Sequence, residues 1–459
     1  MYRFKQLILL GGDLIAFFCA FLCSLSLRHL EIPDIEIITS NLSLFFFVFL
    51  LWIVINYING LYDLKLIHAE DRYKRIFGTA LFSFIAGVAF FYILPSRNIT
   101  PKTILILTVI LGYLLAAGWR GLYNVLIGDK KLKTRILFLG YTKEVEELLA
   151  ILKKEPNTGY EACVIIDPEQ KIKAHDHEHV DVYHNLTALR PSITTKNINT
   201  IVTAPHLDEK EDVMREMYEL LFWSANIVDL TSFYETITGR IPPATFSESW
   251  FIKNIRNTER PVYNKFRRLI DIFSAACFGV IFIILSPILI PSIKYTSKGP
   301  IFFKQKRTGK GEVIFWMYKL RTMYALSKDG SAETQGAQFA KKDDERITWI
   351  GKFLRKSRLD ELPQAWNLLR GDITLIGPRP ERPEIVEKLV DQMAYYPLRH
   401  TVKPGITGWA AVHQHYTDTL ETSLQKLQYD LFYIKNRSFI MDLSIVLKTI
   451  RVVLRGMGQ

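Results

Sequence analysis

The sequence predicts a membrane α and α/β protein in three parts: a four-helix transmembrane bundle, a Rossmann-like doubly wound middle domain, and a C-terminal α/β domain with a re-entrant membrane helix. Three observations lead to this prediction. Long apolar runs fill the first 128 residues, short apolar runs alternate with helical patterns from 129 to 240, and another long apolar run opens the C-terminal part. We therefore place the domains at 1–128, 129–240 and 263–459, with a linker at 241–262.

The composition favours a membrane protein with basic flanks. The chain has 459 residues, a formal net charge of +12 and 49% hydrophobic residues, with 29 Phe and 21 Tyr. It carries no zinc-finger or helix-turn-helix signature, and so we expect no nucleic-acid partner. The four cysteines lack any metal-binding spacing, and we expect them to be inert thiols.

Four apolar runs are long enough to span a bilayer, at about 7–27, 42–62, 76–95 and 103–127. The loop after the first run is acidic, whereas the other flanks are basic, with Arg3, Lys5, Lys65, Arg72, Lys74, Arg75, Arg120, Lys130, Lys131, Lys133 and Arg135. Because positively charged flanks stay in the cytoplasm, we expect the N-terminus and everything after the fourth run on the cytoplasmic side. Asp13 lies inside the first run, where we expect a structural partner within the bundle, because an unpaired ionisable group is costly there.

The middle domain shows strand patterns at 135–140, 162–167, 200–204 and 226–230, a helix at about 210–224, and a helix capped by Thr142. This alternation predicts a parallel sheet covered by helices. Only Gly140 of the dinucleotide-binding glycine fingerprint is present, because Thr142 and Val145 occupy the later glycine positions. We therefore do not expect NAD binding. A spacer, a dimer contact and a regulatory site remain open roles.

A fifth apolar stretch covers 272–293, and we place the re-entrant helix at about 267–291. Ser286-Pro287 and Pro291 interrupt this stretch, and proline kinks a helix because it removes a backbone donor. A bent helix that enters and leaves the same face of the membrane is therefore expected, and a straight transmembrane helix is the alternative. Arg267, Arg268 and Asp271 at its start would lie among the lipid headgroups, ion-paired or holding lipid phosphate.

The C-terminal part concentrates charge in residues 355–380. Adjacent carboxylates, Asp360 and Glu361, follow the cations Arg355, Lys356 and Arg358. Cations suit an anionic substrate, and carboxylate oxygens suit a hard divalent ion such as Mg²⁺. Neighbouring residues on a helix point about 100° apart, so the two acids should have separate roles. A solvated helix start is the alternative interpretation.

The surrounding C-terminal sequence predicts further elements. Residues 300–323 should form two strands around a glycine-containing turn, and 325–343 a mobile loop. The stretch 438–457 has Lys448, Arg451 and Arg455 opposite apolar residues, which fits either a helix on an anionic membrane surface or ordinary packing of a terminal helix.

Several stretches in one order resemble the monotopic phosphoglycosyl transferases, in particular their large polyprenyl-phosphate hexose-1-phosphate transferase branch, which has the same order of parts. The matching stretches are Arg267-Arg268-x-x-Asp271, Ser286-Pro287, Met317-Tyr-Lys-Leu-Arg321, Asp344-x-Arg346-Ile-Thr, Leu359-Asp-Glu-Leu-Pro-Gln364, Gly371-Asp-Ile-Thr-Leu-Ile-Gly-Pro-Arg-Pro380 and Lys403-Pro-Gly-Ile-Thr-Gly-Trp409.

This resemblance implies an enzyme of the bacterial inner membrane that starts a surface polysaccharide. It would transfer a sugar-1-phosphate from a UDP-sugar to undecaprenyl phosphate and release UMP. Asp360 would be the nucleophile, and Glu361 would bind Mg²⁺ together with it. The expected substrate-binding residues are Arg379, Arg346, Lys319, Arg321, Arg358, Arg267 and Arg268, although a solvated strand face would also explain Lys319 and Arg321. Membrane lipids and a second copy of the chain are further expected partners.

Two other function classes were weighed against this one. A membrane-anchored regulatory protein could sense a nucleotide in the middle domain, but it would have no need for Asp360 and Glu361 with all their cations. A nucleotide-sugar oxidoreductase would need a glycine fingerprint with a catalytic Tyr and Lys, which the middle domain does not show. The sequence does not name the sugar.

Overall fold

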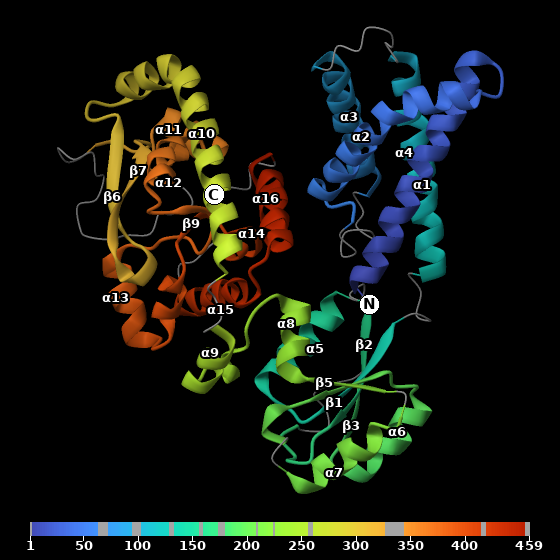
Figure 1. The fold of residues 1–459 in the computed structure, drawn as a ribbon. Helices are drawn as coiled ribbons and strands as arrows, with labels where there is room; N and C mark the ends of the chain where they lie inside the picture. Colours follow the sequence, from blue (N-terminus) through green and yellow to red (C-terminus); the bar gives the residue numbers. More distant parts are fainter. Residues whose placement is uncertain are drawn as a thin grey trace. The chain divides into compact units, whose positions relative to one another are not determined.

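The computed structural model describes residues 2–62, 72–93, 102–127, 133–155, 159–172, 180–207, 210–223, 225–255, 260–325, 344–414 and 419–454. The chain divides into two compact units, Met1–Phe233 and Tyr234–Gln459. The first holds the apolar helices and the parallel sheet, and the second holds the long apolar helix and the C-terminal α/β region (Figure 1).

Four apolar helices begin the chain: α1 (Tyr2–His29), α2 (Ile35–Ile58), α3 (Arg72–Ile93) and α4 (Lys102–Ile127). Each is long and apolar enough to cross a membrane. The helices occur where the sequence predicts them, except that α2 begins at Ile35 rather than near residue 42, because Ile37 and Ile38 continue its apolar face and pack on the bundle core. The flanking residues Arg3, Lys5, Lys65, Arg72, Lys130, Lys131 and Arg455 lie outside the part described in side-chain detail.

A buried polar network joins the four helices. Arg120 of α4 donates to both carboxylate oxygens of Asp13 in α1, at 2.8 and 2.6 Å. Asn56 of α2 donates to Asp13 at 3.3 Å and accepts a hydrogen bond from Tyr113 of α4 at 2.7 Å, and the hydroxyl of Tyr113 also bonds Ser83 of α3. The structural partner expected for Asp13 is therefore confirmed. The exposed flanking position expected for Arg120 is wrong, because the side chain is 3% exposed and paired inside the bundle.

A five-stranded parallel sheet follows, with strands in the order β3-β2-β1-β4-β5. The strands are β1 (Thr134–Leu139), β2 (Tyr160–Ile166), β3 (Asp181–Tyr183), β4 (Thr200–Thr203) and β5 (Asn226–Asp229). All the strands expected from the sequence are confirmed. The additional strand β3 has only three residues, none of them fully buried, which is too short for a recognisable pattern.

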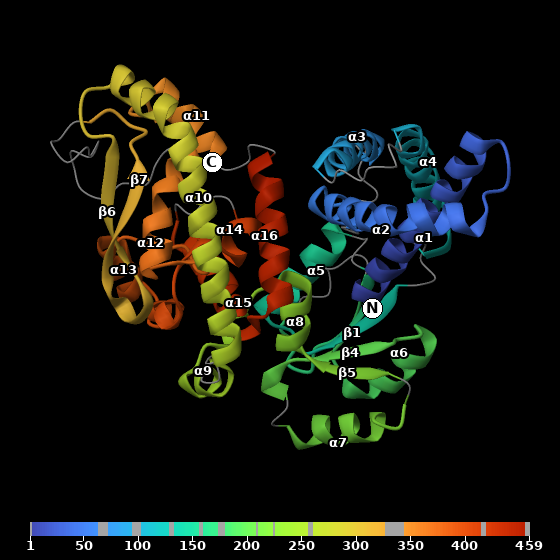
Figure 2. The ribbon, with the colours of Figure 1, turned by 45° about the horizontal axis from the view of Figure 1, so that its top comes forward.

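Helices cover both faces of this sheet (Figure 2). On one face α6 (Leu189–Thr195) and α7 (Glu211–Leu220) pack on Leu137 and Leu139. On the other lie α5 (Lys143–Lys154) and α8 (Leu230–Thr238), and Phe233 of α8 contacts Phe138. Thr142 caps α5 as predicted, accepting a hydrogen bond from the amide of Val145. The coarse architecture, an α/β domain with a parallel sheet, is confirmed.

The second unit opens with short elements that contribute to its core. The segment expected as a linker forms α9 (Glu248–Ile255), and Ile241, Phe251 and Ile255 are buried in the apolar core of this unit. The long helix α10 (Pro261–Thr296) follows and is a fifth candidate membrane span. It contains Pro287 and Pro291, and Figure 1 shows it changing direction towards its C-terminal end.

The C-terminal α/β region is built from a hairpin, a two-stranded parallel sheet and helices. The predicted pair of strands is confirmed as the antiparallel hairpin β6 (Phe302–Thr308) and β7 (Ile314–Leu320). The strands β8 (Thr374–Ile376) and β9 (Gly405–Thr407) pair in parallel. The remaining elements are α11 (Trp349–Ser357), η8 (Leu359–Gln364), α12 (Ala365–Arg370), α13 (Pro383–Gln392), η9 (Tyr396–Thr401), α14 (Trp409–His413), α15 (Leu420–Asn436) and α16 (Phe439–Leu454). The loop expected at 325–343 lies, from 326 onward, outside the described residues.

Candidate active site around Asp360 and Glu361

A sharp change of chain direction places the two acids inside the C-terminal unit. Thr348 caps the start of α11 by accepting a hydrogen bond from the amide of Gly351 at 3.0 Å. The helix ends at Arg358, whose φ of 58° is in the left-handed region that a side chain makes unfavourable. The next turn, η8, then carries Asp360 and Glu361 inward, with 7% and 6% of their surfaces exposed. The alternative of a solvated helix start is therefore wrong.

Glu361 is surrounded by cations from three places in the chain. Its Oε1 lies 3.0 Å from Lys319 Nζ on β7, 3.3 Å from Arg379 Nη2 after β8, and 3.4 Å from Arg358 Nη1. Burial alone would raise the pKa of this carboxyl, but Lys319, Arg379 and Arg358 hold the pKa well below its usual range. Glu361 therefore remains ionised and fixes three cations around one point.

Asp360 has the opposite electrostatic character. Burial raises its pKa above the usual value, the charge of Lys319 opposes this, and neighbouring Glu361 adds to the increase. Its Oδ1 is buried and has no hydrogen-bond partner among the described residues. An unpartnered buried carboxylate oxygen has lone pairs available for a substrate or a metal, so the two adjacent acids have distinct environments.

Asp360 and Glu361 are the carboxylates of this site that could hold a divalent metal ion. No group of three or more His, Cys, Asp or Glu side chains comes together in the described ranges. Mg²⁺ often binds one or two carboxylates and completes its shell with water and substrate phosphates. Asp360 and Glu361 could supply such a pair, with the unpartnered Oδ1 of Asp360 as the available ligand.

Comparison with known proteins finds a family match over the part of the chain that contains these residues. The bacterial sugar transferase family matches residues 262–456, which include Asp360, Glu361 and all three cations around Glu361. A UDP-glucose:undecaprenyl-phosphate glucose-1-phosphate transferase of Caulobacter vibrioides is 37% identical over 186 residues, which cover 40% of this chain and 68% of that protein. The chain belongs to the bacterial sugar transferase family.

Other relatives of this bacterial sugar transferase are longer than the matched part. A UDP-N-acetylgalactosamine-undecaprenyl-phosphate N-acetylgalactosaminephosphotransferase of Aeromonas hydrophila is 40% identical over 227 residues, 49% of this chain and 51% of that protein. A UDP-glucose:undecaprenyl-phosphate glucose-1-phosphate transferase of Klebsiella pneumoniae is 40% identical over 190 residues, 40% of this chain and 39% of that protein. The matches therefore span about half of these two relatives or less. A CoA-binding domain family matches residues 57–226.

Three of the arginines expected to bind substrate in this bacterial sugar transferase have other contacts. Arg346 pairs with Asp344, its Nε at 2.8 Å and its Nη2 at 2.6 Å from the carboxylate oxygens. Arg268 donates to the backbone carbonyls of Leu368 and Leu369 at the end of α12. Arg267 donates to the carbonyl of Ile376 and to the Thr374 hydroxyl, and it lies 3.5 Å from Asp442.

Arg321 contacts backbone carbonyls rather than the two acids. Its side chain is buried and donates to the carbonyl of Lys298 at 2.7 Å and to those of Ile293 and Ser297, where α10 ends. The alternative of a solvated strand face is wrong for Arg321 and also for Lys319, whose side chain is only 18% exposed. The expected substrate contact of Arg321 finds no support in these bonds. A sequence alone cannot distinguish Arg321 from Lys319, because both lie in one motif on β7 and its end.

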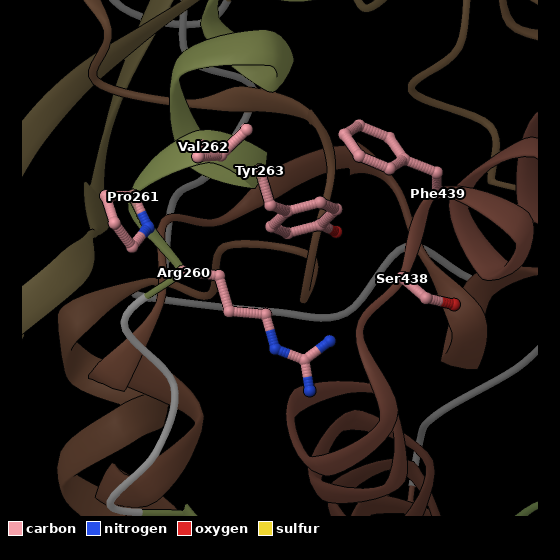
Figure 3. A pocket seen from close by; sticks show the side chains of 6 residues that line it. All are labelled: Arg260, Pro261, Val262, Tyr263, Ser438 and Phe439. Carbon is pink, nitrogen blue, oxygen red and sulfur yellow. The ribbon is translucent and has the colours of Figure 1, made fainter.

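The membrane-helix residue Ser286 forms a hydrogen bond within its own helix. Ser286, which directly precedes Pro287, donates to the carbonyl of Ile283 within α10 at 2.9 Å. A cavity of about 540 Å³ at the starts of α10 and α16 is lined by Arg260, Pro261, Val262, Tyr263, Ser438 and Phe439 (Figure 3). It includes neither of the acids nor their cations.

Sequence reasoning missed a buried ionic layer that holds the Arg379 segment. Arg399 pairs with Asp430 at 2.8 Å and donates to the backbone carbonyl of Arg379 at 2.8 Å. Arg307 donates to the carbonyl of Pro380 at 3.0 Å. A usable signal was present in α15, where the charged residues Lys426 and Asp430 directly precede the buried Leu427 and Leu431.

Glu381 belongs to the same layer and lies next to Lys426 and Arg307. Burial alone would raise the pKa of its carboxyl, but the nearby Lys426, Arg399 and Arg307 lower it to about 2. Glu381 is therefore ionised at neutral pH, and the layer fixes the backbone from which Arg379 reaches Glu361.

Proposed function

We propose that this chain transfers a sugar-1-phosphate from a UDP-sugar to undecaprenyl phosphate, through a covalent intermediate on Asp360. Two features of adjacent residues carry the proposal. Asp360 has a buried carboxylate oxygen without a partner among the described residues, and Glu361 contacts three cations. Relatives whose names state a transfer of this kind match 49% and 40% of this chain. The product would be undecaprenyl-diphosphate-sugar, the first membrane-bound precursor of a surface polysaccharide.

The proposed reaction has two steps. In the first, an oxygen of the Asp360 carboxylate attacks the phosphorus bonded to the sugar, the bond to the bridging oxygen breaks, and UMP leaves with that electron pair. In the second, a phosphate oxygen of undecaprenyl phosphate attacks the same phosphorus, and the bond to Asp360 breaks and restores the carboxylate. A carboxylate nucleophile thus divides an exchange between two anions into two simpler displacements.

The cations would neutralise the phosphoryl oxygens that gain charge. Lys319, Arg358 and Arg379 converge on one carboxylate oxygen, so an entering diphosphate would find them already positioned. Mg²⁺, when bound, would supply further charge neutralisation at the same phosphates, with Asp360 and Glu361 as its protein ligands. Because Glu361 stays ionised, it keeps the cations together before the substrate enters.

The membrane arrangement is part of the proposal. Many apolar side chains of α10 are exposed, among them Phe273 at 71%, Ile283 at 69% and Ile288 at 66%, which suits contact with lipid. Pro287 and Pro291 lie inside α10, and Figure 1 shows this helix changing direction towards its C-terminal end, which supports a re-entrant helix rather than a straight span. The middle domain and the C-terminal unit would then lie on the cytoplasmic side of the bacterial inner membrane.

The sugar is best found by experiment, because the named relatives differ in theirs. Purified full-length protein with Mg²⁺ and undecaprenyl phosphate would be given UDP-glucose, UDP-galactose, UDP-N-acetylglucosamine and UDP-N-acetylgalactosamine, and UMP would be measured. We expect sustained UMP release from one donor, dependent on the lipid and lost in Asp360→Asn. Lack of UMP from every donor with folded protein would overturn the proposal.

A further inference from the structure

Two cations from different elements converge at the C-terminal end of α12. Gly371 ends this helix with a φ of 80°, a left-handed conformation that glycine adopts without strain. A Cβ on Gly371 would lie 3.1 Å from Nζ of Lys403 and 3.3 Å from Nη1 of Arg268. Both cationic nitrogens are therefore close to one point, Arg268 reaching it from α10 and Lys403 from the segment before β9.

This pair carries uncompensated positive charge. Arg268 donates only to the backbone carbonyls of Leu368 and Leu369, and in the described part of the chain neither it nor Lys403 forms an ion pair. Partial burial lowers the pKa of Lys403 first, and the charges of Arg268 and Lys310 lower it further, whereas the charges of Asp271 and Asp372 raise it. An anion placed beside Gly371 would relieve this repulsion.

The cations lie at the border of an apolar surface. On α10 the side chains of Leu269 and Ile272 are 63% and 41% exposed, and on α12 those of Trp366 and Leu369 are 56% and 44% exposed. Exposed apolar side chains beside cations suit the region where lipid tails meet headgroups. The anion expected here is therefore attached to a lipid tail rather than free in solution.

We propose that Arg268 and Lys403 form a binding site for the phosphate of an anionic membrane lipid, whose tail lies on the exposed apolar side chains of α10 and α12. The site shares no residue with the cations around Glu361 and so does not depend on the sugar-phosphate chemistry. It would fix the height of the catalytic region relative to the membrane surface. Arg268 also holds the end of α12, and so Lys403 is the residue whose role is purely ligand binding.

The test uses the full-length protein in nanodiscs that contain phosphatidylcholine and spin-labelled phosphatidylglycerol. Electron paramagnetic resonance measures how strongly the labelled lipid is held relative to labelled phosphatidylcholine. We expect Lys403→Gln to weaken this preference roughly five-fold, since one lysine at an anionic surface contributes about this factor. Lys403→Arg should keep it, and Lys388→Gln, which removes an exposed lysine on α13, should leave it unchanged.

Two further arms identify the source of the phosphate. If undecaprenyl phosphate displaces the labelled lipid from the wild type but not from Lys403→Gln, the site is supported and undecaprenyl phosphate is one of its ligands. Displacement by inorganic phosphate at equal concentration would overturn the lipid assignment. An equal preference in the wild type and Lys403→Gln would overturn the site itself. The measurement needs no turnover, so its outcome is independent of the transferase assay.

Discussion

At the scale of single residues, two adjacent acids differ because their surroundings differ. Glu361 contacts three cations and stays ionised, whereas burial raises the pKa of Asp360 and leaves one of its oxygens without a partner among the described residues. A two-step phosphoryl transfer needs a nucleophile with available lone pairs, the role proposed for Asp360. It also needs cations held near that nucleophile, and Glu361 would hold them. Both roles follow from position in η8, not from residue type.

The raised pKa of Asp360 predicts the pH dependence of the first step. The attacking carboxylate must be ionised, so the rate of the UMP burst in single turnover should fall on the acidic side at a pH above the ordinary value of 3.8. Lys319 is the largest opposing influence, so Lys319→Gln should move this fall to higher pH. Lys388→Gln should not move it. An unchanged acidic limb in Lys319→Gln would contradict the electrostatic account of the site.

Removal of one cation gives a second prediction. A hydrogen bond to a charged group contributes about 1.5–3 kcal/mol, so Arg379→Gln should lower kcat/KM for the UDP-sugar roughly 10- to 150-fold. Part of the loss should appear as a higher KM, because Arg379 would hold the donor phosphates in the ground state as well. Arg346→Gln tests the difference between the arginines, since Arg346 contacts Asp344 rather than Glu361. A larger loss in Arg346→Gln than in Arg379→Gln would reverse their assignment.

At the scale of elements, α10 connects the membrane to the catalytic region. Asp271 accepts hydrogen bonds from the Thr374 hydroxyl and the Leu375 amide, both at 2.8 Å, and Arg321 binds the carbonyls where α10 ends. The N-terminal part of α10 is thus bonded to β8, and its C-terminal end is bonded to the residue that follows β7. A substrate that arrives along the membrane would meet a rigidly placed site.

The re-entrant course that we propose for α10 predicts which side of the membrane its ends occupy. The test uses the variants Lys265→Cys and Lys298→Cys, each made in protein whose native cysteines have been replaced. Both should react with a membrane-impermeant maleimide that is added on the cytoplasmic side. In the double variant Pro287→Ala and Pro291→Ala, a straight helix becomes available, and labelling at position 298 should shift to the other face. Opposite faces for the two positions with both prolines present would show a spanning helix.

At the scale of the whole molecule, a buried ion pair between Asp13 and Arg120 joins α1 and α4 of the four apolar helices. Loss of one partner from a buried pair typically costs about 3–5 kcal/mol, because the other charge stays buried and unpaired. Arg120→Leu should therefore lower the apparent Tm in detergent strongly, and adding Asp13→Leu should recover much of the loss. If the double variant has an apparent Tm no higher than that of Arg120→Leu, an unpaired Asp13 charge is not the reason why Arg120→Leu is destabilised.

Much of this architecture follows from the sequence, because apolar runs and strand–helix alternation are local patterns. The contacts of the site do not, because Lys319 and Arg379 stand 42 and 18 residues from Glu361 and reach it only in the fold. Arg321 and Arg346 occur in motifs as prominent as that of Arg379, yet they contact backbone carbonyls and Asp344. The charged layer of Arg399 and Asp430 was also hidden, since only packing shows that Arg399 donates to the carbonyl of Arg379.

The central claim is that Asp360 becomes covalently bonded to the sugar phosphate, and trapping that intermediate tests it most directly. The protein would be mixed with its UDP-sugar and Mg²⁺ without undecaprenyl phosphate, quenched in acid, digested and analysed by mass spectrometry. The account predicts one equivalent of UMP at most and a sugar-phosphate adduct on the peptide that contains Asp360, lost when undecaprenyl phosphate is added before quenching. UMP release that occurs only with the lipid, and no adduct at any time, would contradict it and indicate direct transfer between the two substrates.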